Sequence, residues 1–484
     1  MIFSSHLFLF AFLPLCVAAY ALVPRRGRSA MLALLSYVFY GWAHPPWVIL
    51  MLVSTVLDFT CGLVIVRRAR LEAQGRNYPL LGKGTRRDRI QKLALASSVI
   101  GNLAVLGFFK YFDFTAESIN HVAEAFGGDG ALPLLYVALP VGISFYTFQT
   151  MSYTIDIYRG DGRALRNPLD FACYVAMFPQ LVAGPIVRYH DVDRQLVERS
   201  HTWEKTARGC TLFACGFAKK VLLANPMGTI ADAAFTADGL HTIDAWYGVV
   251  AYAFQIYFDF SGYSDMAIGL GLMFGFVFIK NFDSPYHADS ITDLWRRWHI
   301  SLSTWLRDYL YIPLGGNRGS TWRTYGNLAT VMLLGGLWHG AAWTFVIWGA
   351  IHGAMLAFER AQGKDGAYRR LPRPLRITIT FAVVCLAWIF FRAESLTQAG
   401  DYLASCLFLR GTAPGADLVA PLLYTPYQMV IFAACILVTW GAPQSWDFTR
   451  TLTPQRVAWI AALFVLGVSA LWTQTENPFL YFQF

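Results

Sequence analysis

Apolar segments separated by short polar connections follow one another along the whole chain. Because a membrane-spanning helix needs about 20 mostly apolar residues, the pattern predicts about ten to twelve crossings. Two of the segments are long enough for two crossings or for one broken helix. The predicted segments are residues 6–23, 30–42, 47–66, 93–112, 134–153, 211–235, 246–278, 328–358, 377–391, 418–440 and 457–472.

The chain is therefore predicted to be an all-α polytopic membrane protein, with one membrane domain over residues 1–472 and a tail of residues 473–484. Residues 6–23 lack the basic start and the small-residue cleavage site of a secretory signal, so we expect a retained first helix. Composition agrees, since only 14% of the 484 residues are charged and 56% are hydrophobic. Soluble chains are about a quarter charged, which excludes a water-soluble protein.

The net charge of +9 does not indicate a nucleic-acid-binding protein. Such a protein gathers its basic residues on one soluble surface, whereas here they lie in short runs between apolar segments. Eight cysteines are scattered through apolar stretches without a CxxC pair. They are expected to be small core residues, and no metal site or disulfide framework is predicted.

The distribution of charge predicts an orientation. Residues 67–92 hold nine Lys or Arg against two acids, whereas residues 113–133 hold four acids and no Lys or Arg. Basic connections face the cytoplasm, so the first stretch is expected inside and the second outside. Following the alternation along the chain, both the N-terminus and the tail of residues 473–484 are expected on the outer face.

Two apolar stretches are more polar or more irregular than a lipid-facing helix. Residues 140–158 carry several hydroxyls together with Gln149 and Asp156, and such groups at membrane depth usually face protein or a water-filled cavity. Residues 178–186, which include Gln180, contain two prolines and one glycine. Because proline removes backbone donors, this second stretch predicts a re-entrant or loop segment that is buried in protein.

A third stretch, residues 255–265, places two carboxylates inside an apolar run. If it is helical, Asp259 and Tyr263 share one face and Asp265 lies on another. The two carboxylates need partners at that depth. They either hold neighbouring helices together or line a site.

The fourth stretch, residues 281–323, is dense in tryptophan and arginine. This composition favours a helix that lies at the cytoplasmic interface with its aromatic residues at headgroup level. Asp293 and Arg297 are four residues apart and can pair on one helix face. A surface anchor would explain most of this stretch without any chemistry.

His339 lies within a strongly apolar segment and is flanked by Gly335, Gly336 and Gly340. An intramembrane histidine is often a packing residue, but the missing side chains of the glycines leave room for another backbone or for a substrate. A neutral histidine with an ordinary pKa of about 6.5 is suited to act as general base towards a hydroxyl. That is the chemistry of O-acyl transfer.

Four motifs together resemble the membrane-bound O-acyltransferase family, and within it the bacterial branch that acetylates alginate and related polysaccharides. They are Phe-Pro-Gln-Leu-Val-Ala-Gly-Pro-Ile at 178–186, Tyr-Phe-Asp-Phe-Ser-Gly-Tyr-Ser-Asp-Met at 257–266, Trp-Arg-Arg-Trp-His at 295–299 and Leu-Trp-His-Gly at 337–340. The resemblance implies a helical bundle with a through-membrane tunnel, re-entrant segments and cytoplasmic interfacial helices. It also implies transfer of an acyl group from the cytoplasm to a hydroxyl on the outer side.

By this resemblance, His339 matches the near-invariant histidine of the family and His299 its second polar position. His339 would deprotonate the acceptor, and His299 would orient or polarise the thioester. The donor implied is acetyl-CoA or an acyl-carrier protein, with no permanently bound cofactor. Further candidates for the tunnel or for donor binding are Gln180, Asp259, Tyr263, Asp265, Trp295, Arg296, Trp298, Arg307 and Trp338.

The aromatic tail, Asn-Pro-Phe-Leu-Tyr-Phe-Gln-Phe at 477–484, has two interpretations. It can be an interfacial anchor. In the teichoic-acid branch of the family, however, a small separate protein has a similar motif whose tyrosine is implicated as an acyl carrier. The resemblance thus predicts that Tyr481 is acetylated and passes its acetyl group to a periplasmic serine-type (SGNH-like) transferase. The final acceptor would be an exopolysaccharide such as alginate, and the chain would lie in the bacterial inner membrane.

Three alternatives remain at the level of sequence. A transporter or flippase would also use buried polar groups, but it would show internal repeats with paired broken segments, and none is evident. Transfer of D-alanine or of a longer acyl chain would keep the chemistry and change the cargo, although that branch normally lacks a built-in aromatic tail. A structural scaffold is the third alternative.

Overall fold

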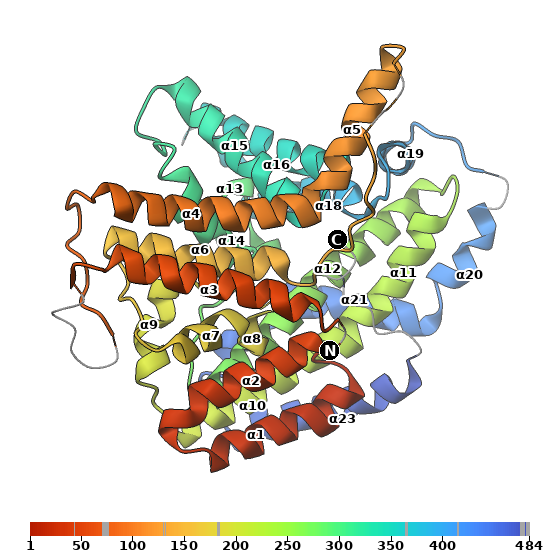
Figure 1. The fold of residues 1–484 in the computed structure, drawn as a ribbon. Coiled ribbons are helices and arrows are strands. Elements are labelled where there is room, and N and C mark those ends of the chain that lie inside the picture. The colour runs from red at the N-terminus through yellow and green to blue at the C-terminus, as the bar shows by residue number, and fades with distance from the viewer. Residues whose placement is uncertain are drawn as a thin grey trace. The chain divides into compact units, whose positions relative to one another are not determined.

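The computed structural model describes residues 1–42, 44–69, 77–128, 130, 132–181, 184–363, 366–413, 416–474 and 480. Within these ranges the regular structure is helical, with one isolated bridge between Asn77 and Leu165 and no strand. The chain forms two compact units. Unit 1 comprises Met1–Cys210 and Ala267–Ile279, and unit 2 comprises Thr211–Met266 and Lys280–Phe484 (Figure 1).

Unit 1 is built from the N-terminal helices. They are η1 Phe8–Phe12, α1 Leu13–Leu22, η2 Arg25–Gly27, α2 Arg28–Gly41, α3 Trp47–Ile65, α4 Arg89–Leu106, η4 Gly107–Tyr111, α5 Phe112–Ala125, α6 Ile143–Arg159, α7 Pro168–Ala176, α8 Phe178–Leu181 and α9 Tyr189–Val197. Buried polar contacts join its helices. Asp58 of α3 accepts hydrogen bonds from Ser98 (2.5 Å) and Asn102 (2.8 Å) of α4.

Unit 2 contains most of the C-terminal half of the chain. Its elements are η5 Lys219–Ala224, α11 Asn225–Thr236, η6 Pro285–His287, α13 Ile291–Arg297, α14 Ile300–Leu306, η7 Arg307–Tyr311, α15 Thr321–His339, α16 Trp343–Gln362, α17 Ala367–Arg370, α18 Arg373–Arg392, α19 Leu396–Cys406, η8 Ala416–Leu418, α20 Ala420–Leu423, α21 Pro426–Gly441, α22 Ser445–Phe448 and α23 Pro454–Thr473. Two helices, α10 Trp203–Ala218 and α12 Thr242–Met273, continue across the boundary between the units.

Several helices meet the length and hydropathy requirements of membrane spans. In the part of the chain that the structure describes, Trp47–Ile65, Arg89–Ala125, Arg373–Arg392 and Pro454–Thr473 do so individually. The pair Ala416–Leu423 and Pro426–Gly441 does so together, with a bend of 69°. The prediction of an all-α membrane protein is confirmed, whereas the number of about ten to twelve crossings stays a prediction.

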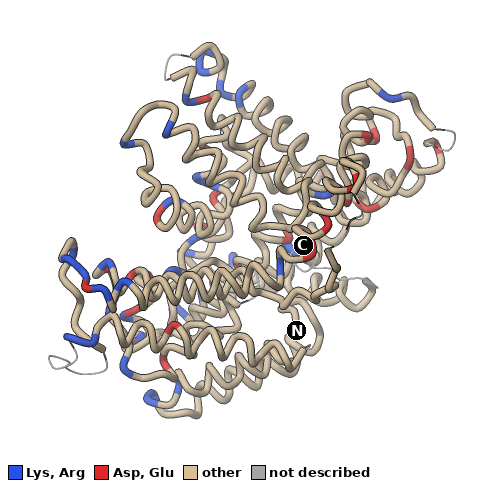
Figure 2. The backbone as a smooth tube through the Cα atoms, turned by 45° about the horizontal axis from the view of Figure 1, so that its top comes forward, with Lys and Arg blue, Asp and Glu red and all other residues tan. Residues whose placement is uncertain are grey.

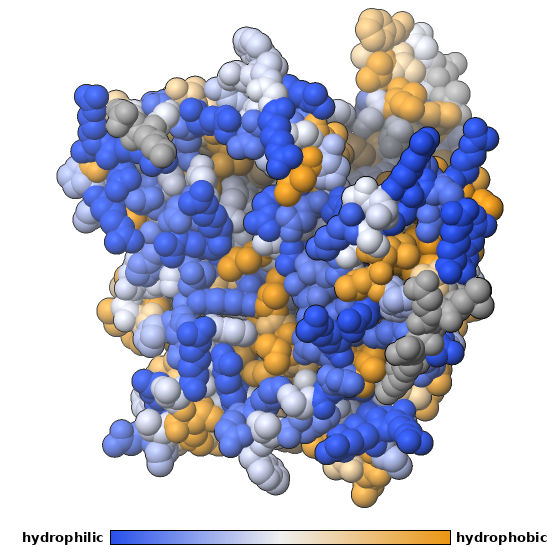
Figure 3. All heavy atoms as spheres, turned by 90° about the vertical axis from the view of Figure 1, so that its left-hand side faces the viewer, coloured by the Kyte–Doolittle hydropathy of each residue, from blue (hydrophilic) through white to orange (hydrophobic). Residues whose placement is uncertain are grey.

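Charge is distributed as expected for such a chain. Figure 2 shows that charged residues lie mostly at helix ends and in connections, and that basic residues gather around the connection between α3 and α4. Hydrophilic side chains are the most common in the view of Figure 3, with hydrophobic ones scattered between them.

The structure resolves the two longest apolar segments differently. Residues 246–278 belong largely to one unbroken helix, α12, whereas residues 328–358 form the end of α15 and most of α16, with a break at Gly340–Ala342. The stretch of residues 281–323 is a series of short helices, and one of the breaks between them lies at His299, whose left-handed backbone conformation (φ 44°) no α-helix can continue through. Its location at the cytoplasmic interface stays a prediction.

Two glycines let α15 and α16 approach closely, and Figure 1 shows these helices side by side. A Cβ atom on Gly336 of α15 would lie 2.3 Å from the carbonyl oxygen of Phe345. A Cβ atom on Gly349 of α16 would lie 2.4 Å from the carbonyl oxygen of Met332. The backbones are thus in direct contact, which fixes the last turn of α15 against α16.

Candidate active site

His299 and His339 come together inside unit 2. Their ring centroids are 6.4 Å apart, and the side chains are 0% and 6% exposed. His339 is the last residue of α15, and His299 lies between α13 and α14. The two histidines that the sequence singled out are therefore neighbours in space, although 40 positions separate them in the chain.

Asn281 fixes the unusual backbone at His299. Its carbonyl accepts a hydrogen bond from the Ile300 N–H (2.9 Å), and its side-chain oxygen accepts from the N–H (3.1 Å) and hydroxyl (2.9 Å) of Ser301. The Asn281 amide donates in turn to Ser264 of α12 (2.9 Å). A non-glycine residue with positive φ persists only where its surroundings hold it, and such residues cluster at functional sites.

The imidazole of His299 is held in one tautomer. Its Nδ1 accepts from the Leu302 N–H (3.4 Å) at the start of α14, which leaves the proton on Nε2. Burial lowers the pKa of His299 to about 3, so the ring is neutral near pH 7. Among the described residues its Nε2 has no hydrogen-bond partner. A fully buried N–H donor without a partner calls for an explanation, and an acceptor oxygen on a bound substrate supplies one.

Aromatic rings surround His339. The ring centroids of Trp338, Trp348 and Phe391 lie 5.0, 5.2 and 5.2 Å from that of His339. At Gly340 a Cβ atom would lie 2.0 Å from the ring of Phe345, so only glycine fits there. These groups keep bulk water from the histidine, and electrostatic interactions are stronger in such surroundings.

A third buried histidine, His352, was missed by the sequence analysis. It is 2% exposed, its ring lies 4.7 Å from that of Trp348 and 5.4 Å from that of Trp295, and neither ring nitrogen has a partner within the described ranges. Trp348, His352, Met355 and Glu359 follow one face of α16. The signal that would have identified His352 is the recurrence of polar residues, His352 and Glu359, at helical spacing within an apolar segment.

A basic cavity lies at the far end of this face of α16. It has a volume of about 390 Å³ and is lined by residues of α13, α16, α17 and α18. Its acids are engaged: Glu359 accepts from the N–H groups of Ile291 (2.6 Å) and Thr292 (2.9 Å), while Asp293 pairs with Arg297 (2.8 Å) and Asp289 with Arg376 (3.1 Å). The expected pair of Asp293 and Arg297 is confirmed. Three further arginines complete the lining, namely Arg296, Arg369 and Arg373.

The two carboxylates of residues 255–265, in α12, each pair with a lysine. Lys219 lies 2.7 Å from Asp265, and Lys220 lies 2.7 Å from Asp259. Both lysines belong to the π-helical segment η5, and the sequence analysis did not identify them as the partners. The pairs join η5 to α12, so a structural role is present. Tyr263 is buried one turn after Asp259.

The other predicted residues have more ordinary surroundings. Trp298 packs against Trp388 and Phe282, with ring centroids 5.1 Å away in each case. Arg307 pairs with Asp308 (2.7 Å) at the surface. Gln180 belongs to unit 1, where its amide donates to the Tyr174 carbonyl. Tyr481 lies outside the described residues, but Leu480 is described and is 4% exposed.

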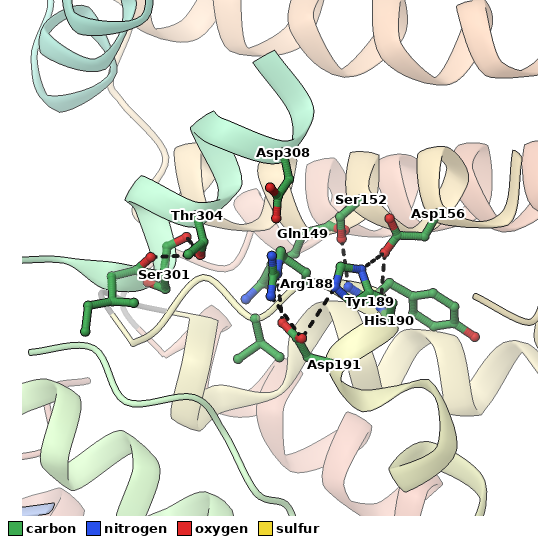
Figure 4. A network of polar contacts seen from close by, with 12 residues as sticks. Gln149, Ser152, Asp156, Arg188, Tyr189, His190, Asp191, Ser301, Thr304 and Asp308 are labelled. Carbon is green, nitrogen blue, oxygen red and sulfur yellow. Dashed lines mark hydrogen bonds and ion pairs between the residues drawn. The ribbon is translucent and has the colours of Figure 1, made fainter. Parts of the chain in front are cut away.

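Unit 1 contains its own polar network, shown in Figure 4. Asp156 of α6 accepts from the backbone N–H of His190 (3.0 Å) and contacts its Nδ1 (2.9 Å). Ser152 accepts from the N–H of Tyr189 (3.0 Å), and Arg188 pairs with Asp191 (2.9 Å). These contacts fasten α9 to α6, which explains Ser152 and Asp156 among the polar residues of 140–158.

Known proteins resemble this chain over most of its length. The model of the membrane-bound O-acyltransferase family matches residues 142–396. A probable alginate O-acetylase of Azotobacter vinelandii is 44% identical over 100% of both chains. A protein of the same description from Pseudomonas aeruginosa is 50% identical over 85% of this chain and 76% of its own length. A peptidoglycan O-acetyltransferase of Helicobacter pylori is 36% identical over 85% of this chain and 81% of its own.

Proposed function

Since this chain belongs to the membrane-bound O-acyltransferase family and is an O-acyltransferase, we propose that it moves acetyl groups from a cytoplasmic thioester to a periplasmic polysaccharide such as alginate. It would do so in the bacterial inner membrane with both termini in the periplasm, and Tyr481 would carry the acetyl group. Family membership sets aside the transporter and scaffold alternatives. The relatives are named as enzymes that acetylate alginate or peptidoglycan, which supports a polysaccharide as the final acceptor.

The observation that carries the proposal is the buried pair of His299 and His339. His339 takes the proton of the attacking hydroxyl, as a general base in dry surroundings can. The Nε2–H of His299 donates to the thioester carbonyl oxygen, which gains negative charge as the tetrahedral intermediate forms. One donor of this kind contributes about 10²–10³ in rate.

The first transfer forms a tyrosyl ester. The phenol oxygen of Tyr481 attacks the acetyl carbonyl carbon, its proton passes to His339, and the bond between that carbon and sulfur breaks. The thiol leaves with the proton from His339. Because a phenol has a pKa near 10, well below that of a sugar hydroxyl, phenolate is a good leaving group and the ester remains activated. The hydroxyl of a periplasmic serine-type transferase then accepts the acetyl group and passes it to the polysaccharide.

The basic cavity supports a donor that bears phosphates, and we propose acetyl-CoA. Arg296, Arg369 and Arg373 line it beyond the acids that are already paired. Guanidinium groups bind phosphate through charge-assisted hydrogen bonds. The face of α16 from Glu359 to Trp348 spans 11 residues, or about 17 Å at 1.5 Å per residue. A donor with a long flexible arm suits a phosphate site and a reaction site that are so far apart.

Mass spectrometry of the C-terminal peptide tests donor, cargo and carrier together. After incubation of the purified protein with isotopically labelled acetyl-CoA, we expect one labelled acetyl group on Tyr481. The label should be absent in Tyr481→Phe and in His339→Ala. Full polysaccharide acetylation in cells that express Tyr481→Phe would refute the carrier role, and a labelled D-alanyl or longer acyl adduct would refute the cargo.

A further inference from the structure

The chain binds its own tail at two places in unit 2. The backbone N–H of Leu480 donates to a carboxylate oxygen of Asp259 at 3.0 Å, and this contact is buried. At the end of α23, the side chain of Gln474 accepts from the amide of Asn225 (2.7 Å) and donates to the carbonyl of Val221 (3.1 Å). The first contact is to α12, and the second is to η5 and to Asn225, which directly follows it.

The register of η5 explains why the Val221 carbonyl is available. In this π-helical segment, Lys219–Ala224, the N–H of Asn225 bonds to the carbonyl of Lys220, five residues back. The next N–H in that register would serve Val221, but residue 226 is proline and has none. Gln474 takes the place of the missing donor. π-Helical turns are rare in proteins, and those that occur often lie at functional sites.

The Lys220–Asp259 pair supplies the second contact. Its side chains are 3% and 2% exposed, and the charged atoms are 2.7 Å apart. Burying two charges is costly, and apolar residues in their place often give a protein that is at least as stable. Stabilisation of the fold is therefore a weak explanation for a buried ion pair. Here the carboxylate holds Lys220 and, with its other oxygen, the Leu480 N–H.

We propose that η5 and Asp259 form an intramolecular docking site for the C-terminal tail, and that Lys220 and Asp259 are positioning residues for the acyl carrier. Tyr481 directly follows Leu480 in the sequence, and consecutive Cα atoms are about 3.8 Å apart, so the docking contact is made by the immediate neighbour of the proposed carrier. The role in acetyl transfer rests on the proposed function. The docking itself does not.

The decisive variant replaces both charges at once. Lys220→Met with Asp259→Leu removes the docking carboxylate without leaving a buried unpaired charge, so the bundle is expected to fold. Lys219→Met with Asp265→Leu is the matched control, because it removes the adjacent pair between the same two elements. Within the described part of the chain, neither Lys219 nor Asp265 contacts Gln474 or Leu480.

Hydrogen–deuterium exchange of the C-terminal peptide reports docking in the full-length protein. We expect slow exchange in the wild type, at least about tenfold faster exchange in the Lys220–Asp259 double variant, and wild-type exchange in the control. Leu480→Pro, which lacks the N–H, should behave like the double variant, whereas Leu480→Val should stay protected. Equal exchange in the wild type and the Lys220–Asp259 variant would overturn the docking site.

Kinetics separate positioning from folding. The Lys220–Asp259 double variant should have a lower kcat for acetyl transfer and an unchanged KM for acetyl-CoA. The single variant Asp259→Glu, which keeps a carboxylate, should retain part of the kcat that the double variant loses. Wild-type kcat with an unprotected tail would overturn the positioning role. Tyr481→Phe should keep its tail protected. If that variant were protected yet fully active, the carrier proposal would fall and the docking site would stand.

Discussion

Substituting Gly336 by alanine tests whether the contact between α15 and α16 sets the active-site geometry. The added Cβ atom would lie 2.3 Å from the Phe345 carbonyl oxygen, whereas ordinary contacts begin at 3.4 Å. The helices must therefore separate by about 1 Å, because neither backbone can yield locally. That movement separates His339, which is on α15, from Trp348, which is on α16.

The expected effect on stability is small compared with the effect on activity. Overpacking costs about 1–3 kcal/mol, and the better helix propensity of alanine offsets about 1 kcal/mol of this. A displacement of 1 Å in a reacting group, in contrast, can lower the rate by about 10²-fold. We expect Gly336→Ala to fold with a slightly lower Tm and to lose about 10²-fold in acetyl transfer.

Gly326 provides the control on the same helix. A Cβ atom there has nothing within 4 Å, so Gly326→Ala gains helix propensity without displacing α16. Acetylation of Tyr481 from labelled acetyl-CoA gives the rate, and thermal unfolding in detergent gives the Tm. The reasoning fails if Gly336→Ala keeps the wild-type rate, or if Gly326→Ala loses as much activity.

Three further predictions concern the site. Because the pKa of His299 is lowered to about 3 in the folded protein, the unfolded chain binds more protons than the folded one between about pH 3 and 6.5. The Tm of the wild type should therefore fall as the pH drops below 6.5, and the Tm of His299→Asn should depend less on pH. The same pH dependence of Tm in both proteins would contradict the burial argument. His299→Ala at neutral pH should lower kcat by about 10²–10³, and a wild-type kcat would dismiss its role as donor to the carbonyl oxygen. Arg369→Gln with Arg373→Gln should raise the KM for acetyl-CoA about tenfold, in contrast to Arg370→Gln outside the cavity lining, and equal KM values would remove the cavity from donor binding.

The sequence was sufficient for the fold class and for the central pair of histidines. Apolar length predicts helices and membrane location directly, and the motifs around His299 and His339 carried the family resemblance. Their closeness in space was not predicted and comes from the structure. The left-handed turn at His299 has no periodic signal, so the breaks between the short helices of residues 281–323 could not be placed from the sequence.

The lysine partners of α12 were beyond reach for a different reason. Lys219 and Lys220 lie in an apolar segment that matched a simple span, and their partners Asp265 and Asp259 are 46 and 39 positions further along the chain. Pattern analysis places each group on a face of its own helix. Which faces meet depends on packing, here through Gly216 and Gly262, where a Cβ atom would lie 2.3 and 2.6 Å from the partner backbone.

The π-helical register of η5 makes chain length, and not only residue identity, a determinant in this region. A π turn is an α turn that holds one extra residue. Loss of Leu222 or Leu223 would therefore close it to an α turn, with the Asn225 N–H still bonded to the Lys220 carbonyl, then four residues back. An inserted residue, in contrast, would turn Asn225 and Pro226 by about 100° relative to α23, although every side chain that contacts the tail would still be present. This segment is therefore expected to tolerate a single-codon deletion better than a single-codon insertion.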